Sequence, residues 1–73
     1  MTRLPVVTGA QAIKALEQVG FSHMRTKGSH AILRNEHTGS GVTVPLHKPL
    51  KRGTLAAILR QAGISADEFG RFL

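Results

Sequence analysis

The chain has 73 residues, with ten Lys and Arg against four Asp and Glu, three Phe, and no Trp, Tyr or Cys. This length allows a single domain, 1–73, and the lack of cysteine excludes disulfides and thiolate zinc sites. No apolar run approaches the ~18 residues of a membrane span and no leader opens the chain, so we expect a cytoplasmic protein. The net charge of +6 predicts an anionic partner, either nucleic acid or an acidic protein.

The first predicted element is a helix over about residues 9–19. Thr8 and Gln11 have the spacing of a capping box, and Gly20 can supply the left-handed residue that ends a helix. Between them, apolar residues recur at helical spacing and polar residues occupy the opposite side. This pattern is typical of an amphipathic surface helix.

The next part of the chain changes to a period of two, which predicts three short strands, at about 21–26, 29–35 and 42–46. Pairing Leu33 with Val44 places the apolar residues of the second and third strands on one face. The same register sets His30 opposite His47 on the other, polar face, where Arg34 also lies. Registers shifted by one pair keep these faces but stagger the two histidines.

The turn of the first hairpin is predicted at Lys27-Gly28. A two-residue turn there would set Arg25 beside His30. A bulge in the first strand would instead bring in a residue from the other face.

Two further helices are predicted near the C-terminus. Apolar residues at i, i+3, i+4 and i+7 precede Gly63 and define the first of them, namely Leu55, Ile58, Leu59 and Ala62. Ser65 and Glu68 form another capping box, which opens a short terminal helix. Its apolar stripe, which we expect to pack, is made of Phe69, Phe72 and Leu73.

The order of elements is therefore α-β-β-β-α with a short C-terminal helix. This order predicts an α+β two-layer sandwich in which the helices cover one face of the sheet and the polar face stays open. Its order and size resemble the double-stranded-RNA-binding domain, although a fold alone does not establish a ligand.

The four histidines differ in what their positions predict. We expect His37 to be a solvated loop residue and His23 to be an exposed strand residue. His30 and His47 share the polar face, and basic residues follow His47 at once, namely Lys48, Lys51 and Arg52. A histidine can act as base or acid near neutral pH, and cations stabilise the charge that develops on a phosphate during RNA cleavage.

Two other interpretations of this polar face remain open. Two histidines without a nearby carboxylate make a poor metal site, so we expect no metal. A basic face without chemistry could bind RNA, or dock on an acidic protein partner, as a non-catalytic module. The aromatic residues that usually stack on bases are scarce in this chain.

Several motifs also occur in a fixed order along the chain, namely Gly20-Phe21, Lys27-Gly28-Ser29-His30, Val42-Thr43-Val44-Pro45-Leu46-His47, Gly53-Thr54-Leu55 and Ile58-Leu59-Arg60-Gln61-Ala62-Gly63-Ile64. Each motif is weakly specific, but the ordered set at this length is specific. Together they resemble the HicA toxin family of bacterial type II toxin-antitoxin systems, over about Gly9 to Phe69.

The resemblance implies an mRNA interferase, an endoribonuclease that inhibits translation without metal or cofactor. The histidine of the Gly-Ser-His motif would be catalytic, which is His30 here, supported by Gly28 and Ser29. Many members carry a second histidine directly after the first, where this chain has Ala31 on its predicted core face. His47 as general acid is our hypothesis from the predicted register.

The resemblance also implies partners. The substrate would be mRNA, which we expect to be single-stranded or locally unpaired because in-line attack needs a flexible backbone and an accessible 2′-hydroxyl. We expect the chain by itself to bind neither DNA nor a membrane. The basic residues expected to contact RNA are Lys27, Arg34, Lys48, Lys51 and Arg52. A HicB-type antitoxin would cover the active face, and its binding would stabilise a small core by mass action.

Overall fold

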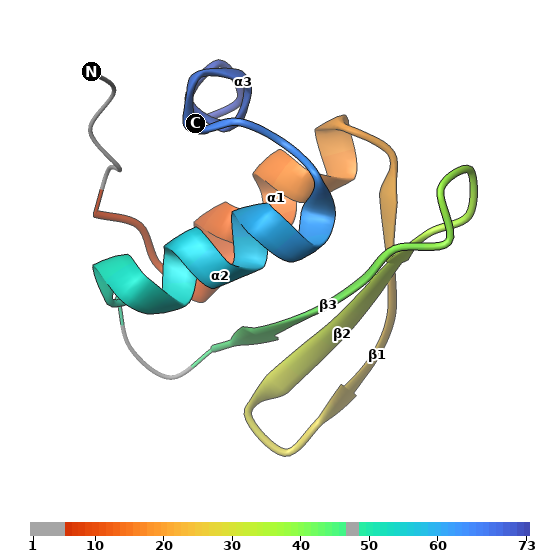
Figure 1. Cartoon of the computed structure of the whole chain (residues 1–73). Helices are drawn as coiled ribbons and strands as arrows, with labels where there is room; N and C mark the ends of the chain where they lie inside the picture. The colour runs from red at the N-terminus through yellow and green to blue at the C-terminus, as the bar shows by residue number, and fades with distance from the viewer. Residues whose placement is uncertain (1–5, 47–48) are drawn as a thin grey trace.

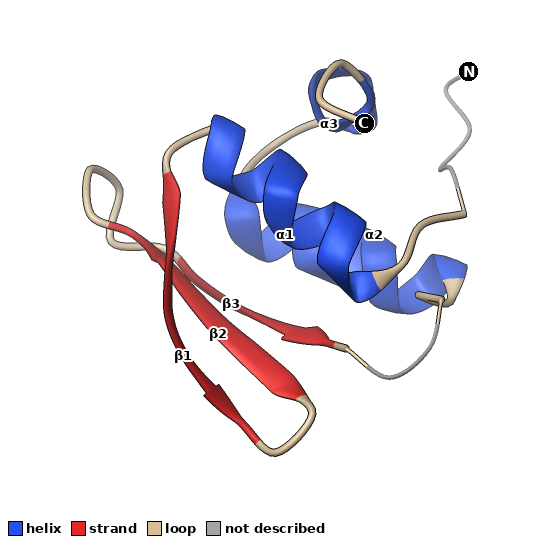
Figure 2. Ribbon diagram, turned by 180° about the vertical axis from the view of Figure 1, so that it is seen from behind, coloured by secondary structure: helices blue, strands red, loops and turns tan. Residues whose placement is uncertain are grey.

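The computed structural model describes residues 6–46 and 49–73. The elements follow in the order α1 (Gly9–Gln18), β1 (Phe21–Lys27), β2 (His30–Asn35), β3 (Gly41–Pro45), α2 (Arg52–Ala62) and α3 (Ala66–Gly70). Figures 1 and 2 show two layers, in which α1 and α2 lie across one face of the sheet and α3 sits at the end of the helix layer. The predicted α+β sandwich with the order α-β-β-β-α is confirmed.

The ends of α1 use the predicted residues. Thr8 Oγ1 accepts a hydrogen bond from the Gln11 N–H at 3.2 Å, and Gln11 Oε1 accepts one from the Thr8 N–H at 2.9 Å. These two bonds complete the capping box. Gly20 has φ of +105°, in the region that favours glycine, so the chain can turn from α1 into β1.

The sheet has the strand order β1-β2-β3, and both pairings are antiparallel. His30 pairs with Pro45 and Leu33 pairs with Val42, so the predicted pairing of His30 with His47 is wrong by one pair. The loop between β2 and β3 favours this register. In it, Asn35 Oδ1 accepts hydrogen bonds from the His37 N–H at 2.9 Å and the Thr38 N–H at 3.3 Å. The predicted faces of β2 and β3 are unchanged, since a shift by two residues keeps every side chain on its side.

The turn between β1 and β2 lies one residue later than predicted. Lys27 pairs with His30, so the two central turn residues are Gly28 and Ser29. Gly28 has φ of +62°, and no described residue other than glycine has positive φ. A left-handed first residue followed by an ordinary second one is the pattern of a type II′ turn, which demands glycine first. The predicted pairing of Arg25 with His30 is therefore wrong.

A β-bulge at Met24 interrupts the first strand, between His23 and Arg25. Without it, Phe21 and Arg25 would share a face, because both positions are odd and side chains alternate along a strand. The extra residue reverses the alternation. Phe21 is therefore buried against the helices, at 3% exposure, while Arg25 and Lys27 are exposed with His30.

The hydrophobic core lies between the helix layer and the sheet. Its five largest fully buried side chains come from five different elements and are Leu16, Leu33, Val44, Leu55 and Phe69. The sixth element, β1, adds Phe21, which is 3% exposed. The core depends on every element being in place at once.

The two C-terminal helices use the predicted Gly63 and Ser65 at their ends, although α3 shows only the Ser65 half of the predicted capping box, and their packing differs from the prediction. Gly63 ends α2 with φ of +73°, and Ser65 Oγ accepts from the Glu68 N–H at 3.0 Å at the start of α3. Phe69 is buried, whereas Phe72 and Leu73 are 39% and 51% exposed, so one of three predicted stripe residues enters the core. No helix in the described ranges combines the length and apolar character that crossing a membrane requires.

The N-terminal segment is held by the segment that precedes α2. The Leu50 N–H donates to the Val7 carbonyl oxygen at 2.7 Å, and Thr8 forms an isolated bridge with Pro49. Gly9, the first residue of α1, is buried against the end of β3, where a Cβ atom would overlap the Pro45 carbonyl oxygen. Glycine at this position lets α1 approach the sheet closely.

Candidate functional site

The face of the sheet turned away from α1 and α2 carries part of the predicted site, namely Lys27, His30 and Arg34. We call it the open sheet face, because Figures 1 and 2 show no helix against it. From the register its residues are Ser22, Arg25, Lys27, His30, Ile32, Arg34, Gly41, Thr43 and Pro45. The three strands contain no Asp or Glu, since the four acidic residues lie in α1, the β2–β3 loop and α3. The open sheet face is therefore positively charged.

His30 is the first residue of the central strand β2 and directly follows the type II′ turn. Its side chain is exposed, and its backbone lies between Lys27 of β1 and Pro45 of β3. The preceding carbonyl oxygen, of Ser29, accepts a hydrogen bond from the Leu46 N–H at 2.7 Å. The backbone that carries this imidazole is thus held by both neighbouring strands.

Three cations accompany His30 on this face. Lys27 is the direct cross-strand partner of His30, so the two side chains start from neighbouring Cβ atoms. Arg34 lies four residues further along β2, at about 13 Å for ~3.3 Å per residue. Arg25 lies between them, opposite Ile32. All three cations are exposed.

Arg25 is absent from the residues predicted to contact RNA, although the turn predicted at Lys27-Gly28 already set it beside His30. The dipeptide Gly28-Ser29 is the local signal for its observed place opposite Ile32. A glycine followed by a non-glycine residue favours a type II′ turn. With the turn at this dipeptide, Lys27 and Arg25 both fall on the same face as His30.

Lys51 and Arg52, the described residues of the basic cluster that follows β3, do not lie on the open sheet face. Lys51 is the N-cap of α2 and makes no side-chain capping bond, and Arg52 is the first residue of that helix. Both are exposed and belong to the helix layer. His47 and Lys48 lie outside the described residues.

The other two histidines are at surface positions, as predicted. The Nε2 atom of His23 lies 2.8 Å from Thr26 Oγ1, on exposed β1. The His37 N–H donates to the Asn35 side chain in the β2–β3 loop, and the His37 side chain is exposed. Within the two described ranges, no group of three or more His, Cys, Asp or Glu side chains could hold a metal ion.

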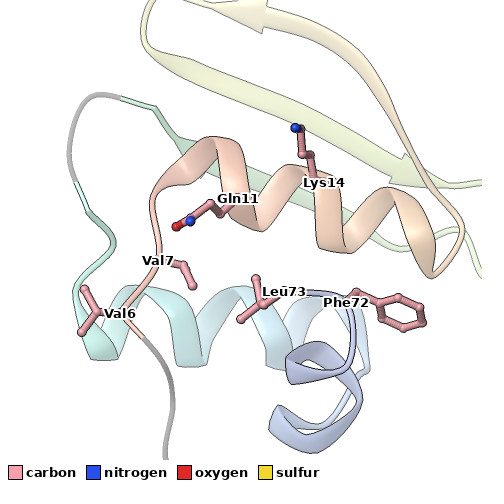
Figure 3. Close-up of a pocket in the computed structure, with 6 residues that line it drawn as sticks. All are labelled: Val6, Val7, Gln11, Lys14, Phe72 and Leu73. Atoms are coloured by element: carbon pink, nitrogen blue, oxygen red, sulfur yellow. The ribbon is translucent and has the colours of Figure 1, made fainter.

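A groove lies in the helix layer, away from the open sheet face. Figure 3 shows this apolar groove, of about 270 Å³, which is lined by Val6, Val7, Gln11, Lys14, Phe72 and Leu73. It lies between the N-terminal segment, α1 and the C-terminal residues. Among the described residues that line it, Lys14 carries the one ionisable side chain, and no histidine stands beside it.

A comparison with known families gives this arrangement a context. Residues 9–64 match the sequence model of the HicA toxins of bacterial toxin-antitoxin systems. The matched range begins with α1 and includes all three strands and α2. The fold and the match define a small toxin of a toxin-antitoxin system. The chain belongs to the HicA toxin family. No curated protein matches the chain.

Proposed function

We propose that this HicA toxin is an mRNA interferase, a cytoplasmic endoribonuclease that cleaves mRNA and so inhibits translation, with His30 as its catalytic residue. The observation that supports this function is the setting of His30. Its exposed side chain starts from a backbone held by two strands, on a face that carries three cations and no carboxylate from the strands. Such a face attracts the RNA backbone.

The proposed chemistry needs a base, an acid and a cation, without a metal. The His30 imidazole takes the proton from a 2′-hydroxyl, the 2′-oxygen bonds to phosphorus, and the bond from phosphorus to the 5′-oxygen breaks. The products are a 2′,3′-cyclic phosphate and a 5′-hydroxyl that has received a proton from the acid. Lys27, the cross-strand partner of His30, stabilises the charge that develops on the phosphate oxygens.

The general acid is proposed to be His47. Its predicted pairing with His30 does not support this role, because Pro45 pairs with His30. His47 still follows that partner by two residues in the sequence. The cleavage rate of His47→Ala tests this assignment.

The substrate is proposed to be single-stranded or locally unpaired, because attack in line with the leaving oxygen needs a flexible backbone and an accessible 2′-hydroxyl. Lys27 and Arg34 would contact its phosphates on the open sheet face. Lys48, Lys51 and Arg52 would extend the path toward the start of α2, where backbone N–H groups favour phosphate.

A HicB-type antitoxin is the proposed protein partner. Silencing by direct occlusion requires it to cover His30, and acidic side chains would complement Lys27 and Arg34. Binding to the folded toxin alone also stabilises it by mass action, which matters for a small core.

Expression in bacterial cells tests the function. Wild type should arrest growth and deplete mRNA, whereas His30→Ala should do neither at equal protein level. His23→Ala is the matched control, because His23 is another exposed strand histidine, and this variant should stay toxic. Equal toxicity of wild type and His30→Ala would contradict the role of His30. Binding of RNA by wild type without cleavage would favour a non-catalytic RNA-binding module.

Purified protein tests the chemistry. We expect cleavage to survive EDTA, and a 2′-deoxy substitution at the cut nucleotide to block it. His30→Ala and His47→Ala should each lower the cleavage rate by about 10²–10⁴ if they act as base and acid. Loss of cleavage in EDTA that zinc restores, or cutting of the 2′-deoxy substrate, would refute this mechanism.

A further inference from the structure

A hollow of about 480 Å³ lies on the open sheet face, toward the end of the sheet that carries the β2–β3 loop. It is lined by residues of all three strands and of that loop, chiefly Met24, Arg25, Ile32, Arg34, Gly39 and Gly41. His30 and Lys27 do not line it. It is therefore separate from the proposed cleavage centre, although it lies on the same face.

Two features of the backbone create this space. Gly41 pairs with Arg34, and because glycine has no side chain, the β3 side of the hollow stays empty. On the β1 side, the bulge at Met24 lets two successive residues, Met24 and Arg25, line the same hollow. Strict alternation along a strand would have sent one of them to the other face.

The lining combines an apolar floor with two guanidinium groups. Ile32 is half-buried and Met24 is 52% exposed, so both present apolar surface to the hollow. Arg25 is the cross-strand partner of Ile32, and Arg34 lies two residues beyond Ile32 on the same face. A flat, apolar group with a negatively charged backbone attached would satisfy both parts of this lining.

A nucleobase in an RNA strand is such a group. Bases stack on aromatic rings or on the planes of arginine guanidinium groups. Phe21 and Phe69 are buried in the core, and Phe72 lines the apolar groove of the helix layer. His30 does not line the hollow, so Arg25 and Arg34, with the soft thioether of Met24, are the stacking surfaces that the open sheet face offers there.

We propose that this hollow is a base-binding subsite for the RNA substrate, in which a base lies on Ile32 and Met24 and stacks on Arg34 or Arg25. This inference rests on the proposed RNA substrate. Arg34 is about 13 Å along β2 from His30, so the bound base belongs to a nucleotide to one side of the cleaved bond. The subsite fixes which bond of the strand reaches His30.

The test uses full-length wild type and a short single-stranded RNA whose cleaved bond has been mapped. Each base in turn is replaced by an abasic sugar, which keeps the phosphate. We expect affinity to fall about tenfold at one position to one side of the cut, and much less elsewhere, because stacking acts base by base. Equal small losses at all positions would overturn the subsite.

Arginine-to-lysine variants separate stacking from charge. Arg34→Lys keeps the positive charge but lacks the planar guanidinium group on which a base can stack. It should weaken binding of intact RNA about tenfold. Binding of the critical abasic RNA should stay nearly unchanged, as in a double-mutant cycle. Arg25→Lys is tested in the same way. The matched control is Arg60→Lys, an exposed arginine at the end of α2, which should change neither affinity. Equal losses for both RNAs in Arg34→Lys and in Arg25→Lys would overturn the stacking role.

The outcomes distinguish this subsite from the ribonuclease itself. Cleavage by wild type without a position-dependent abasic effect would leave the enzyme intact and refute the subsite. If wild type cleaves no RNA, anisotropy with the same short oligonucleotides still reports whether one base position dominates. If Met24→Ala and Arg34→Lys leave RNA affinity unchanged but weaken antitoxin binding, the hollow is a protein contact and the subsite is refuted.

Discussion

The two faces of β2 show how this small protein separates stability from the proposed function. On one face, Leu33 is fully buried against the helices, with Ala31 beside it. On the other face, His30 and Arg34 are exposed and face solvent on the open sheet face. The residues alternate, so neighbours in sequence contribute to different properties. The exposed face can therefore change in sequence with little effect on folding, while the buried face cannot.

The buried face has little stability to spare. A core of this size supplies only ~3–5 kcal/mol, without disulfides to add to it. Single changes on the two faces should therefore have very different effects, and three experiments test this contrast.

The largest effect is expected for Leu33→Ala. Removing a large, fully buried side chain costs about 2–5 kcal/mol, which is comparable to the whole margin, so this variant should be largely unfolded. Ile32→Ala is the matched control, because Ile32 is the adjacent residue but half-buried on the open sheet face. In urea denaturation followed by circular dichroism, Ile32→Ala should lose less than half as much free energy of unfolding as Leu33→Ala. Similar losses for both variants would end the contrast between the faces.

Gly9→Ala should have the next largest effect. Alanine normally favours a helix over glycine, but here its Cβ would overlap the Pro45 carbonyl oxygen. Pushing α1 away from β3 should lower the free energy of unfolding by about 1–3 kcal/mol. Gly53→Ala, in open space in α2, should instead raise it by about 0.4–1 kcal/mol. A Gly9→Ala variant as stable as wild type would show that the two elements can separate freely.

The smallest expected effect concerns salt. In single-stranded RNA, each lost phosphate contact lowers the slope of log K against log salt by about 0.7, so Lys27→Ala with Arg34→Ala should reduce it by about 1.4. Lys51→Ala with Arg52→Ala should do the same if the RNA path reaches α2. Arg60→Ala should leave the slope unchanged. An unchanged slope in the first pair would move the RNA off the open sheet face.

Much of the fold could be predicted because its signals act over short distances. The capping box of Thr8 and Gln11 marks the start of α1, and Gly63 marks the end of α2. The period of two assigns the faces of β2 and β3 without any knowledge of the register. Such local signals agree with one another along most of the chain.

The register and the first turn could not be chosen from the apolar pattern. Leu33 could pair with Val42 or Val44 and bury the same face in either case. The choice is made by polar geometry, namely the Asn35 side chain in the loop and the left-handed Gly28 in the turn. Neither contributes to a hydrophobic period.

The candidate site could be predicted only in part, because alternation assigns faces within one strand but not between neighbouring strands. The shared face of His30 and Arg34 follows from alternation along one strand, and it is confirmed by the register. Lys27 and Arg25 belong to the neighbouring strand, so their partners depended on the turn, and the bulge at Met24 lets Arg25 lie on the open sheet face while Phe21 is buried. A bulge is one extra residue, and no composition signal marks it.

The hydrogen bond from the Leu50 N–H to the Val7 carbonyl joins two parts of the chain that the ribosome makes at different times. The N-terminal residues emerge first, yet their fixed position depends on a segment that follows all three strands. Contacts between residues distant in sequence form late, because the intervening chain must first be ordered. During synthesis, the beginning of this protein is therefore among the last parts to be completed.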